Sequence, residues 1–136
     1  MSKFRVDLDK VEVIDGQGIG EGDFELQVTV MEGSHNVIWP SPSSWVQVDK
    51  NGAPKSINRT MATYEVTTGT LSKRVTVNVK EVDGGTLGND DEGQGYITFN
   101  LTPSTGISTK DVTLSLARDK MKPLGKVKVT MTAQPA

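Results

Sequence analysis

The stretch Phe24-Glu25-Leu26-Gln27-Val28-Thr29-Val30 alternates apolar and polar residues. Successive side chains of a β-strand point to opposite faces, so this alternation predicts a strand with one buried and one solvent-facing side. With this stretch, the apolar runs of the chain occupy residues 4–8, 24–30, 45–48, 61–66, 75–79, 97–101, 112–116 and 127–131. Because no window shows a sustained 3.6-residue period, we expect little or no helix.

The number and spacing of these runs predict the fold class. About eight short strands separated by turn residues are typical of an antiparallel β-sandwich. A chain of 136 residues is near the commonest domain size, so we expect one sandwich domain over residues 1–136. Asp49-Lys50-Asn51-Gly52 predicts a hairpin turn, because Asn and Gly tolerate positive φ. His35 follows Gly33-Ser34 and is also predicted to lie in a turn.

Two segments of the chain are near-copies of each other. Residues 15–23 read D-G-x-x-I-G-x-x-D, and residues 83–91 read D-G-x-x-L-G-x-D-D. A strand-like run precedes each segment, and another follows it. If both segments lie at the same end of the sandwich, their carboxylates converge there.

The charges are distributed unevenly along the chain. None of the 15 Lys and Arg residues falls within 11–49 or 81–109, and these two windows hold 12 of the 17 carboxylates. The net charge of −2 therefore conceals acidic and basic regions. Carboxylates brought together would raise one another's pKa unless a cation relieved the repulsion. The basic C-terminal region could also dock on the acidic loops of another copy, which would give head-to-tail self-association.

Calcium is the ion that such loops would bind best. It takes six to eight oxygen ligands in flexible geometry, and glycine-rich backbone can wrap around an ion. Asp, Asn and Gly are equally the ordinary residues of hydrated turns, so a simple acidic turn stays open as the alternative. The candidate metal ligands are Asp15, Asp23, Glu81, Asp83, Asp90, Asp91 and Glu92.

The second segment resembles part of a known family. The run Val77 to Asp83, a glycine-containing acidic loop, and then 89–99 (NDDEGQGYITF) are similar to the third calcium-binding loop of C-two domains. The segment from Val11 to Val30 is similar to their first calcium loop. The resemblance implies an eight-stranded antiparallel sandwich that binds phospholipid or protein. It also implies first-loop ligands at Asp15 and Asp23, and third-loop ligands at Glu81, Asp83 and Asp91, with Asp90 or Glu92 as substitutes.

Four apolar residues are candidates for contact with a partner. Ile19 and Leu87 each lie near the middle of an acidic segment, and Trp39 and Trp45 flank a proline-containing connection. The first two could instead fold back over the end of the sandwich, and one tryptophan could belong to the core. The sequence does not favour a membrane as the partner, because inserting loops usually carry more or larger apolar residues.

Several function classes have little support in the sequence. There is no cysteine, P-loop, dinucleotide fingerprint or zinc spacing, and His35 is the only histidine, so we expect no enzyme activity. The basic residues near the C-terminus are interleaved with Asp111 and Asp119 and lack stacking aromatics, which makes nucleic acid an unlikely partner. The N-terminus lacks the apolar run of a secretory signal, so we expect synthesis in the cytoplasm, with incorporation into a particle or signal-less release both open.

These patterns favour a non-catalytic binding module. Its acidic, calcium-binding loop end would mediate attachment to a protein or a surface. One alternative is a structural subunit of a larger particle, such as a virion, a phage tail or a contractile injection apparatus, with no need for metal. A third hypothesis is a carbohydrate-binding module that uses Trp39 or Trp45.

Overall fold

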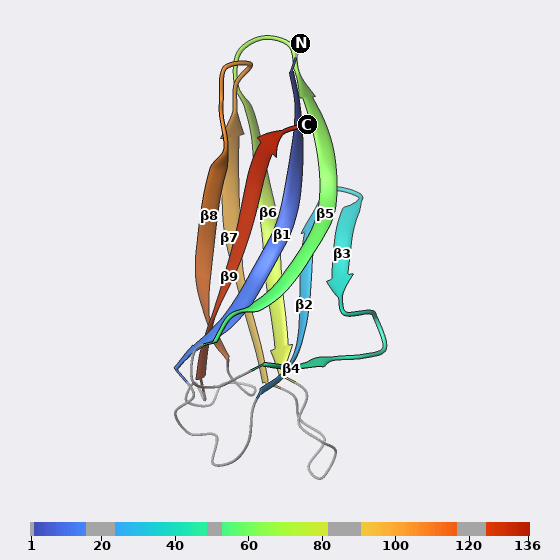
Figure 1. The fold of residues 1–136 in the computed structure, drawn as a ribbon, viewed down its shortest axis with the longest axis vertical. Helices are drawn as coiled ribbons and strands as arrows, with labels where there is room; N and C mark the ends of the chain where they lie inside the picture. The colour runs from blue at the N-terminus through green and yellow to red at the C-terminus, as the bar shows by residue number, and fades with distance from the viewer. Residues whose placement is uncertain (1, 16–23, 49–52, 82–90, 117–124) are drawn as a thin grey trace.

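The computed structural model describes residues 2–15, 24–48, 53–81, 91–116 and 125–136. These residues contain strands and turns but no helix, and hence no helix that could cross a membrane. All strand pairs are antiparallel, which confirms the predicted all-β class (Figure 1). The strands are β1 Ser2–Asp15, β2 Phe24–Glu32, β3 His35–Trp39, β4 Val46–Val48, β5 Lys55–Val66, β6 Leu71–Glu81, β7 Asp91–Leu101, β8 Ser108–Leu116 and β9 Gly125–Pro135.

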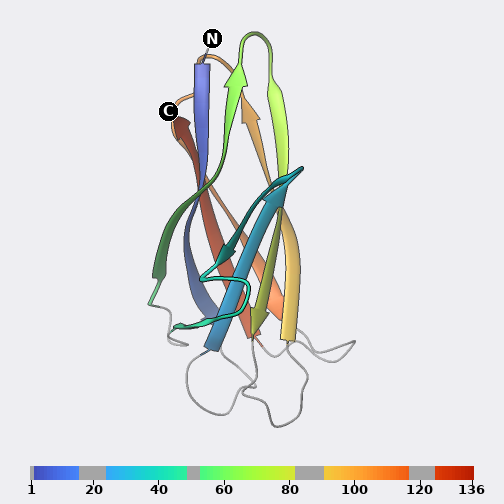
Figure 2. The ribbon, with the colours of Figure 1, turned by 90° about the vertical axis from the view of Figure 1, so that its right-hand side faces the viewer.

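Two sheets form the layers of a sandwich (Figure 2). One sheet has the strand order β5-β1-β9-β8. The other has the order β3-β2-β6-β7, and β4 also pairs with β2. The chain therefore changes layer between β1 and β2, β4 and β5, β5 and β6, and β7 and β8. Each sheet thus combines strands from distant parts of the sequence.

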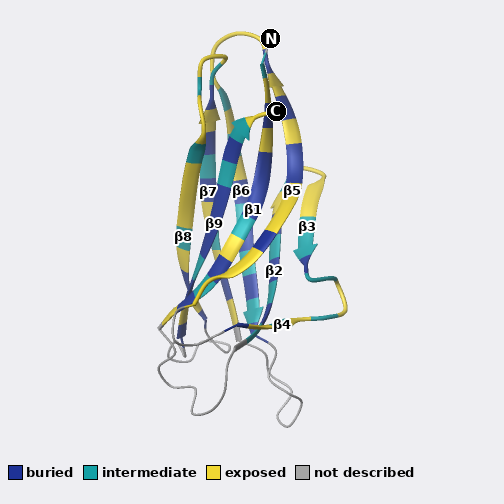
Figure 3. Ribbon diagram, in the orientation of Figure 1, coloured by how far each residue is buried: buried dark blue, intermediate teal, exposed yellow. Residues whose placement is uncertain are grey.

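The core lies between the two sheets and follows the alternation of the sequence. Along β2 the side chains of Leu26, Val28 and Val30 are fully buried, whereas the residues between them are partly exposed. Figure 3 shows the same alternation of buried and exposed positions along the other strands. Burial of these aliphatic side chains is the main stabilising contribution to the fold. The largest fully buried side chains include Phe4, Phe99, Leu8, Leu101, Leu116 and Met131.

A β-bulge divides β1 into two parts. Leu8 pairs with Met131 and Lys10 pairs with Thr130, so Asp9 is an extra residue relative to β9. The extra residue shifts the alternation, and Val11 follows Leu8 as the next inward-facing side chain. The bulge thereby keeps both halves of a 14-residue strand in the core.

The lateral edge formed by β7 and β8 depends on two glycines. A Cβ atom at Gly93 would lie 2.7 Å from the backbone oxygen of Ser115, and one at Gly95 would lie 2.6 Å from Cδ2 of Leu114. A side chain at position 93 would require the β8 backbone to move, and one at position 95 would require the Leu114 side chain to shift. The glycines therefore allow β7 of one sheet to pack directly on β8 of the other.

Side chains connect the layers at the opposite edge, near β3 and β5. The Tyr64 hydroxyl of β5 donates a hydrogen bond to Glu32 Oε1 of β2 at 2.5 Å, and the His35 ring packs edge-on against the Tyr64 ring. Arg59 Nη1 donates to the Pro40 carbonyl at 2.9 Å. This edge is closed by polar and aromatic contacts, in contrast to the glycine contacts of the other edge.

The strand count and one predicted turn differ from what the sequence predicts. The described residues form nine strands, because His35–Trp39 pairs with β2. The prediction that His35 lies in a turn is wrong, since Gly33, with φ of 57°, permits a turn of two residues and Glu32 pairs directly with His35. The hairpin turn predicted at 49–52 lies outside the described residues; the strands on either side of it, β4 and β5, belong to different sheets.

Candidate functional site

One end of the sandwich gathers the strand ends that flank both acidic segments. In one sheet Asp15 pairs with Lys126, and Leu116 pairs with Gly125. In the other sheet Glu81 pairs with both Leu26 and Asp91. These strand ends lie together at the lower end of the molecule in Figure 1, which we call the loop-bearing end. Residues 16–23 and 82–90 lie outside the described part of the chain.

The predicted metal ligands fall into three groups: residues with described side chains, residues with only a described backbone, and residues outside the described ranges. Glu81 is buried at the end of β6, and Glu92 is exposed near the start of β7. The backbones of Asp15 and Asp91 occupy strand ends. Within the described ranges, no group of three or more His, Asp or Glu side chains is arranged to hold a metal ion. Asp23, Asp83, Asp90, Ile19 and Leu87 lie outside those ranges.

The acidic and basic regions of the sequence meet inside one chain. Because β9 lies beside β1, Lys128 Nζ contacts Glu12 Oε1 at 2.9 Å. The hydrogen bond and the charge of Glu12 raise the pKa of Lys128. Lys126 is likewise the register partner of Asp15. Lys128 of the basic C-terminal region therefore neutralises a carboxylate of its own chain, which reduces the charge available for head-to-tail association.

The two tryptophans have different environments. Trp39 ends β3 and belongs to the core, with 6% of its surface exposed, whereas Trp45 is 46% exposed. The connection between them is held against β2, because the Gln27 side-chain amide donates to the carbonyls of Ser41 at 2.8 Å and Ser44 at 3.1 Å. Trp45 is thus the tryptophan available to a partner.

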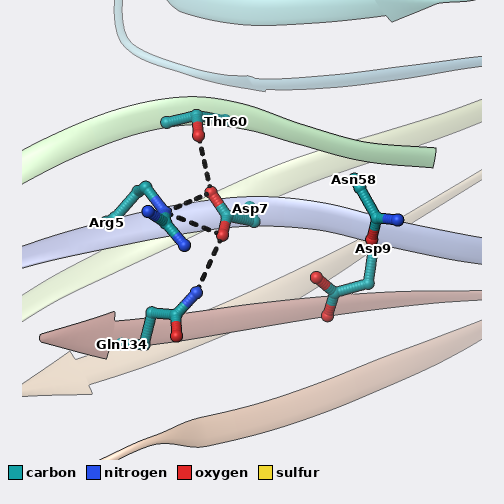
Figure 4. Close-up of a pocket in the computed structure, with 6 residues that line it drawn as sticks. All are labelled: Arg5, Asp7, Asp9, Asn58, Thr60 and Gln134. Carbon is teal, nitrogen blue, oxygen red and sulfur yellow. Dashed lines mark hydrogen bonds and ion pairs between the residues drawn. The ribbon is translucent and has the colours of Figure 1, made fainter. Parts of the chain in front are cut away.

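A second site lies on the outer face of the sheet containing β1, away from the loop-bearing end. It centres on Asp7, whose side chain faces outward between the inward-facing Val6 and Leu8, yet Asp7 is only 8% exposed. Arg5 Nε donates to both carboxylate oxygens at 3.1 and 2.9 Å. Thr60 Oγ1 of β5 donates at 2.8 Å and Gln134 Nε2 of β9 at 3.0 Å. These donors replace water around the buried carboxylate and hold it between three strands (Figure 4).

The Asp9 carboxylate borders the same site. Thr132 of β9 donates a hydrogen bond to Asp9 Oδ2. Burial raises the pKa of Asp9 above its ordinary value, the Thr132 hydrogen bond opposes this change, the charge of Asp7 raises the pKa further, and Lys10 lowers it. Among the described residues, Asp9 thus accepts from one side chain, whereas Asp7 accepts from three.

Arg5, Asp7, Asp9, Asn58, Thr60 and Gln134 line an open depression of about 450 Å³, which we call the Asp7–Asp9 pocket. Asn58 has a positive φ of 54° and lies where β5 has an extra residue relative to β1. The pocket therefore forms where the pairing of β1 with both neighbouring strands is irregular. Bulges of this kind commonly redirect side chains beside functional sites.

No motif in the sequence predicts this pocket. Thr60 and Gln134 are 53 and 127 positions from Asp7, so no local motif joins them. The only local signal is the interrupted alternation between Leu8 and Val11, with Asp7 and Asp9 beside it. That signal indicates a bulge but not the residues that neighbouring strands bring to it.

Comparison with known proteins adds no assignment for either site. The chain matches no protein-family model, and a search of curated proteins gives no match.

Proposed function

We propose that the protein is a non-catalytic binding module that attaches to a protein partner or a surface through its loop-bearing end, with Ca²⁺ bound by the acidic segments. The observation that carries the proposal is the gathering of the four strand ends that flank both segments, in β1, β2, β6 and β7. A binding site formed by two loops on a rigid sandwich is a common arrangement, because the scaffold positions loops that vary freely.

The positions of the strand ends are compatible with a shared ion. Glu81 and Asp91 are direct register partners, and paired residues of antiparallel strands lie about 4.5–5.5 Å apart at Cα. Asp15 ends a strand of the facing sheet, and packed sheets are separated by about 10 Å. Short loops from both layers can therefore reach a common point. Carboxylate and backbone oxygens are the ligands that calcium prefers.

Thermal unfolding with Ca²⁺, with Mg²⁺ and with excess chelator tests this proposal. A ligand that binds only the folded state stabilises it by about 2.7 kcal/mol at a hundredfold excess over Kd, so we expect Tm to rise by several degrees with Ca²⁺ alone. The double variant Asp83→Asn and Asp91→Asn should lose this response. Glu65→Gln is the matched control, because Glu65 lies on the outer face of β5 and pairs with Lys3 near the start of β1.

Two results would contradict the proposal. One is an unchanged Tm of the wild-type protein over a wide range of calcium concentrations. The other is a calcium response that persists in the double variant. With no calcium response, concentration-dependent oligomers in light scattering would favour the structural-subunit hypothesis.

A further inference from the structure

We propose that the Asp7–Asp9 pocket is a second binding site, and that it takes a terminal sugar of a glycan through the sugar hydroxyl groups. The pocket lies on the outer face of β5, β1 and β9, and none of its six lining residues belongs to the acidic segments. This inference therefore does not depend on calcium binding at the loop-bearing end.

The frame of the pocket is fixed before any ligand binds. The Asp7 carboxylate accepts from Arg5, Thr60 and Gln134, which belong to three adjacent strands. Thr132 holds one oxygen of Asp9. Polar groups held by the scaffold in this way lose little conformational freedom on binding, which favours affinity.

Several polar groups of the pocket keep free hydrogen-bonding capacity. The Arg5 Nη groups, Asp9 Oδ1, Gln134 Oε1 and the Asn58 side chain make no hydrogen bond to another described residue. The Arg5 guanidinium and the Asn58 Nδ2 group are donors, whereas Asn58 Oδ1, Asp9 Oδ1 and Gln134 Oε1 are acceptors. In Figure 4 the Asp9 carboxylate extends from its strand toward the side of the pocket where Asp7 and Gln134 lie.

This mixture of groups selects among ligand classes. A metal ion would meet the Arg5 guanidinium and an Asp7 carboxylate whose two oxygens already accept hydrogen bonds. An anion would be repelled by two carboxylates, and an apolar ligand would bury polar groups without partners. A sugar hydroxyl both donates and accepts, so neighbouring hydroxyls can satisfy Asp9 together with Asn58 or Arg5.

The size and position of the pocket support a single terminal sugar. Its volume of about 450 Å³ lies within the range of about 300–1,000 Å³ that is usual for small-molecule sites. The pocket opens outward from the sheet face, so the rest of a glycan can extend into solvent. Hydrogen bonds to charged groups contribute more than neutral ones. We therefore expect the Asp9 carboxylate to discriminate most strongly between sugars that differ in their hydroxyl groups.

A panel of immobilised glycans tests the proposal directly. Its members end in glucose, galactose, mannose, fucose, N-acetylglucosamine or N-acetylgalactosamine. The proteins compared are wild type, Asp9→Ala, Asn58→Gly and the control Asp111→Asn, which changes an exposed carboxylate on β8. Glycine accepts the positive φ of residue 58, so Asn58→Gly removes the amide and preserves the backbone.

We expect the wild-type protein to bind at least one member of the panel, and to do so equally well in excess chelator. Asp9→Ala and Asn58→Gly should each weaken that binding at least tenfold, and Asp111→Asn should leave it unchanged. Failure of the wild-type protein to bind any member would overturn the proposal. Binding that both variants retain would also overturn it. Binding abolished by chelator but retained by Asp9→Ala would assign the sugar to the loop-bearing end instead.

Discussion

The Asp7–Asp9 pocket and the loop-bearing end both collect carboxylates, but they compensate the charge differently. In the pocket, Asp7 is buried and receives donors from β1, β5 and β9. At the loop-bearing end, Glu12 is compensated mainly by one lysine across the strand pair, in contact with solvent. Buried carboxylates need fixed donors because water is absent, whereas partly exposed ones are stabilised by water as well. The contrast predicts very different effects of substitution at the two sites.

Asp7→Ala should have the largest effect. The substitution removes the hydrogen bonds that Arg5, Thr60 and Gln134 donate to a buried carboxylate, so we expect a loss of about 2–4 kcal/mol in the free energy of unfolding. Urea denaturation measures this change. Asp7→Asn keeps the shape and one acceptor, and should lose less. A loss below about 0.5 kcal/mol, as for ordinary surface substitutions, would show that the pocket does not differ from the rest of the surface.

Gly93→Ala tests whether packing rather than charge holds the strands near the loop-bearing end. The added Cβ would overlap the Ser115 backbone oxygen, which cannot move without moving β8, so we expect a loss of about 1–3 kcal/mol. Gly106→Ala is the control, because no atom lies within 4 Å of its Cβ position. Thermal unfolding of both variants distinguishes close packing from a general effect of replacing glycine. Equal Tm values for the two would contradict the expectation.

Asp9→Asn should slightly stabilise the protein at neutral pH. The pKa of Asp9 is raised above 3.8 in the folded state, so the folded protein binds more protons than the unfolded chain just above that pH. Stability attributable to Asp9 therefore falls as pH rises through this window. We expect a gain of no more than about 0.5 kcal/mol at pH 7, which disappears below pH 4. Urea denaturation at both pH values measures it.

The charged groups near Asp9 are Asp7, Lys10 and Arg5 of its own strand, whereas β5 and β9 present neutral side chains. If Asp9→Asn is more stable than wild type at neutral pH and Asp9→Ala binds sugar more weakly, the Asp9 carboxylate contributes to binding and not to stability. A loss of stability in Asp9→Asn at pH 7 would show that the Thr132 hydrogen bond outweighs burial.

Glu12→Gln should have the smallest effect. The ion pair between Glu12 and Lys128 contacts solvent, so removing it should lower the free energy of unfolding only slightly. The decrease should be smaller still at high salt. Because the pKa of Lys128 is raised in the folded state, its stabilising contribution is complete below the ordinary lysine pKa and is lost as pH rises through the folded value. Denaturation at pH 7 and at alkaline pH, each at low and high salt, checks both expectations. A large decrease in the free energy of unfolding that does not depend on salt would show that Glu12 behaves like the buried carboxylate of Asp7.

Much of the fold could be predicted because it depends on local alternation. Runs such as Leu26, Val28 and Val30 predict strands wherever they occur. The extent of β5 could not be predicted so well, since its first half, Lys55 to Thr60, has a single apolar residue and pairs as a strand only beside β1. The prediction of a turn at His35 is wrong for a related reason: the strand that follows the Gly33-Ser34 turn is short, and its pairing with β2 establishes it.

By itself, the sequence determined the class of the fold, most of its strands and the presence of two similar acidic segments. Side-chain alternation and glycine-rich composition are properties of consecutive residues, so they can be read without knowing the partners. Tertiary structure alone decided that the strand ends flanking both segments gather at one end. It also decided that Lys128 neutralises Glu12 and that Thr60 and Gln134 surround Asp7. Each of these depends on strand order and register, which bring together residues that are distant along the chain.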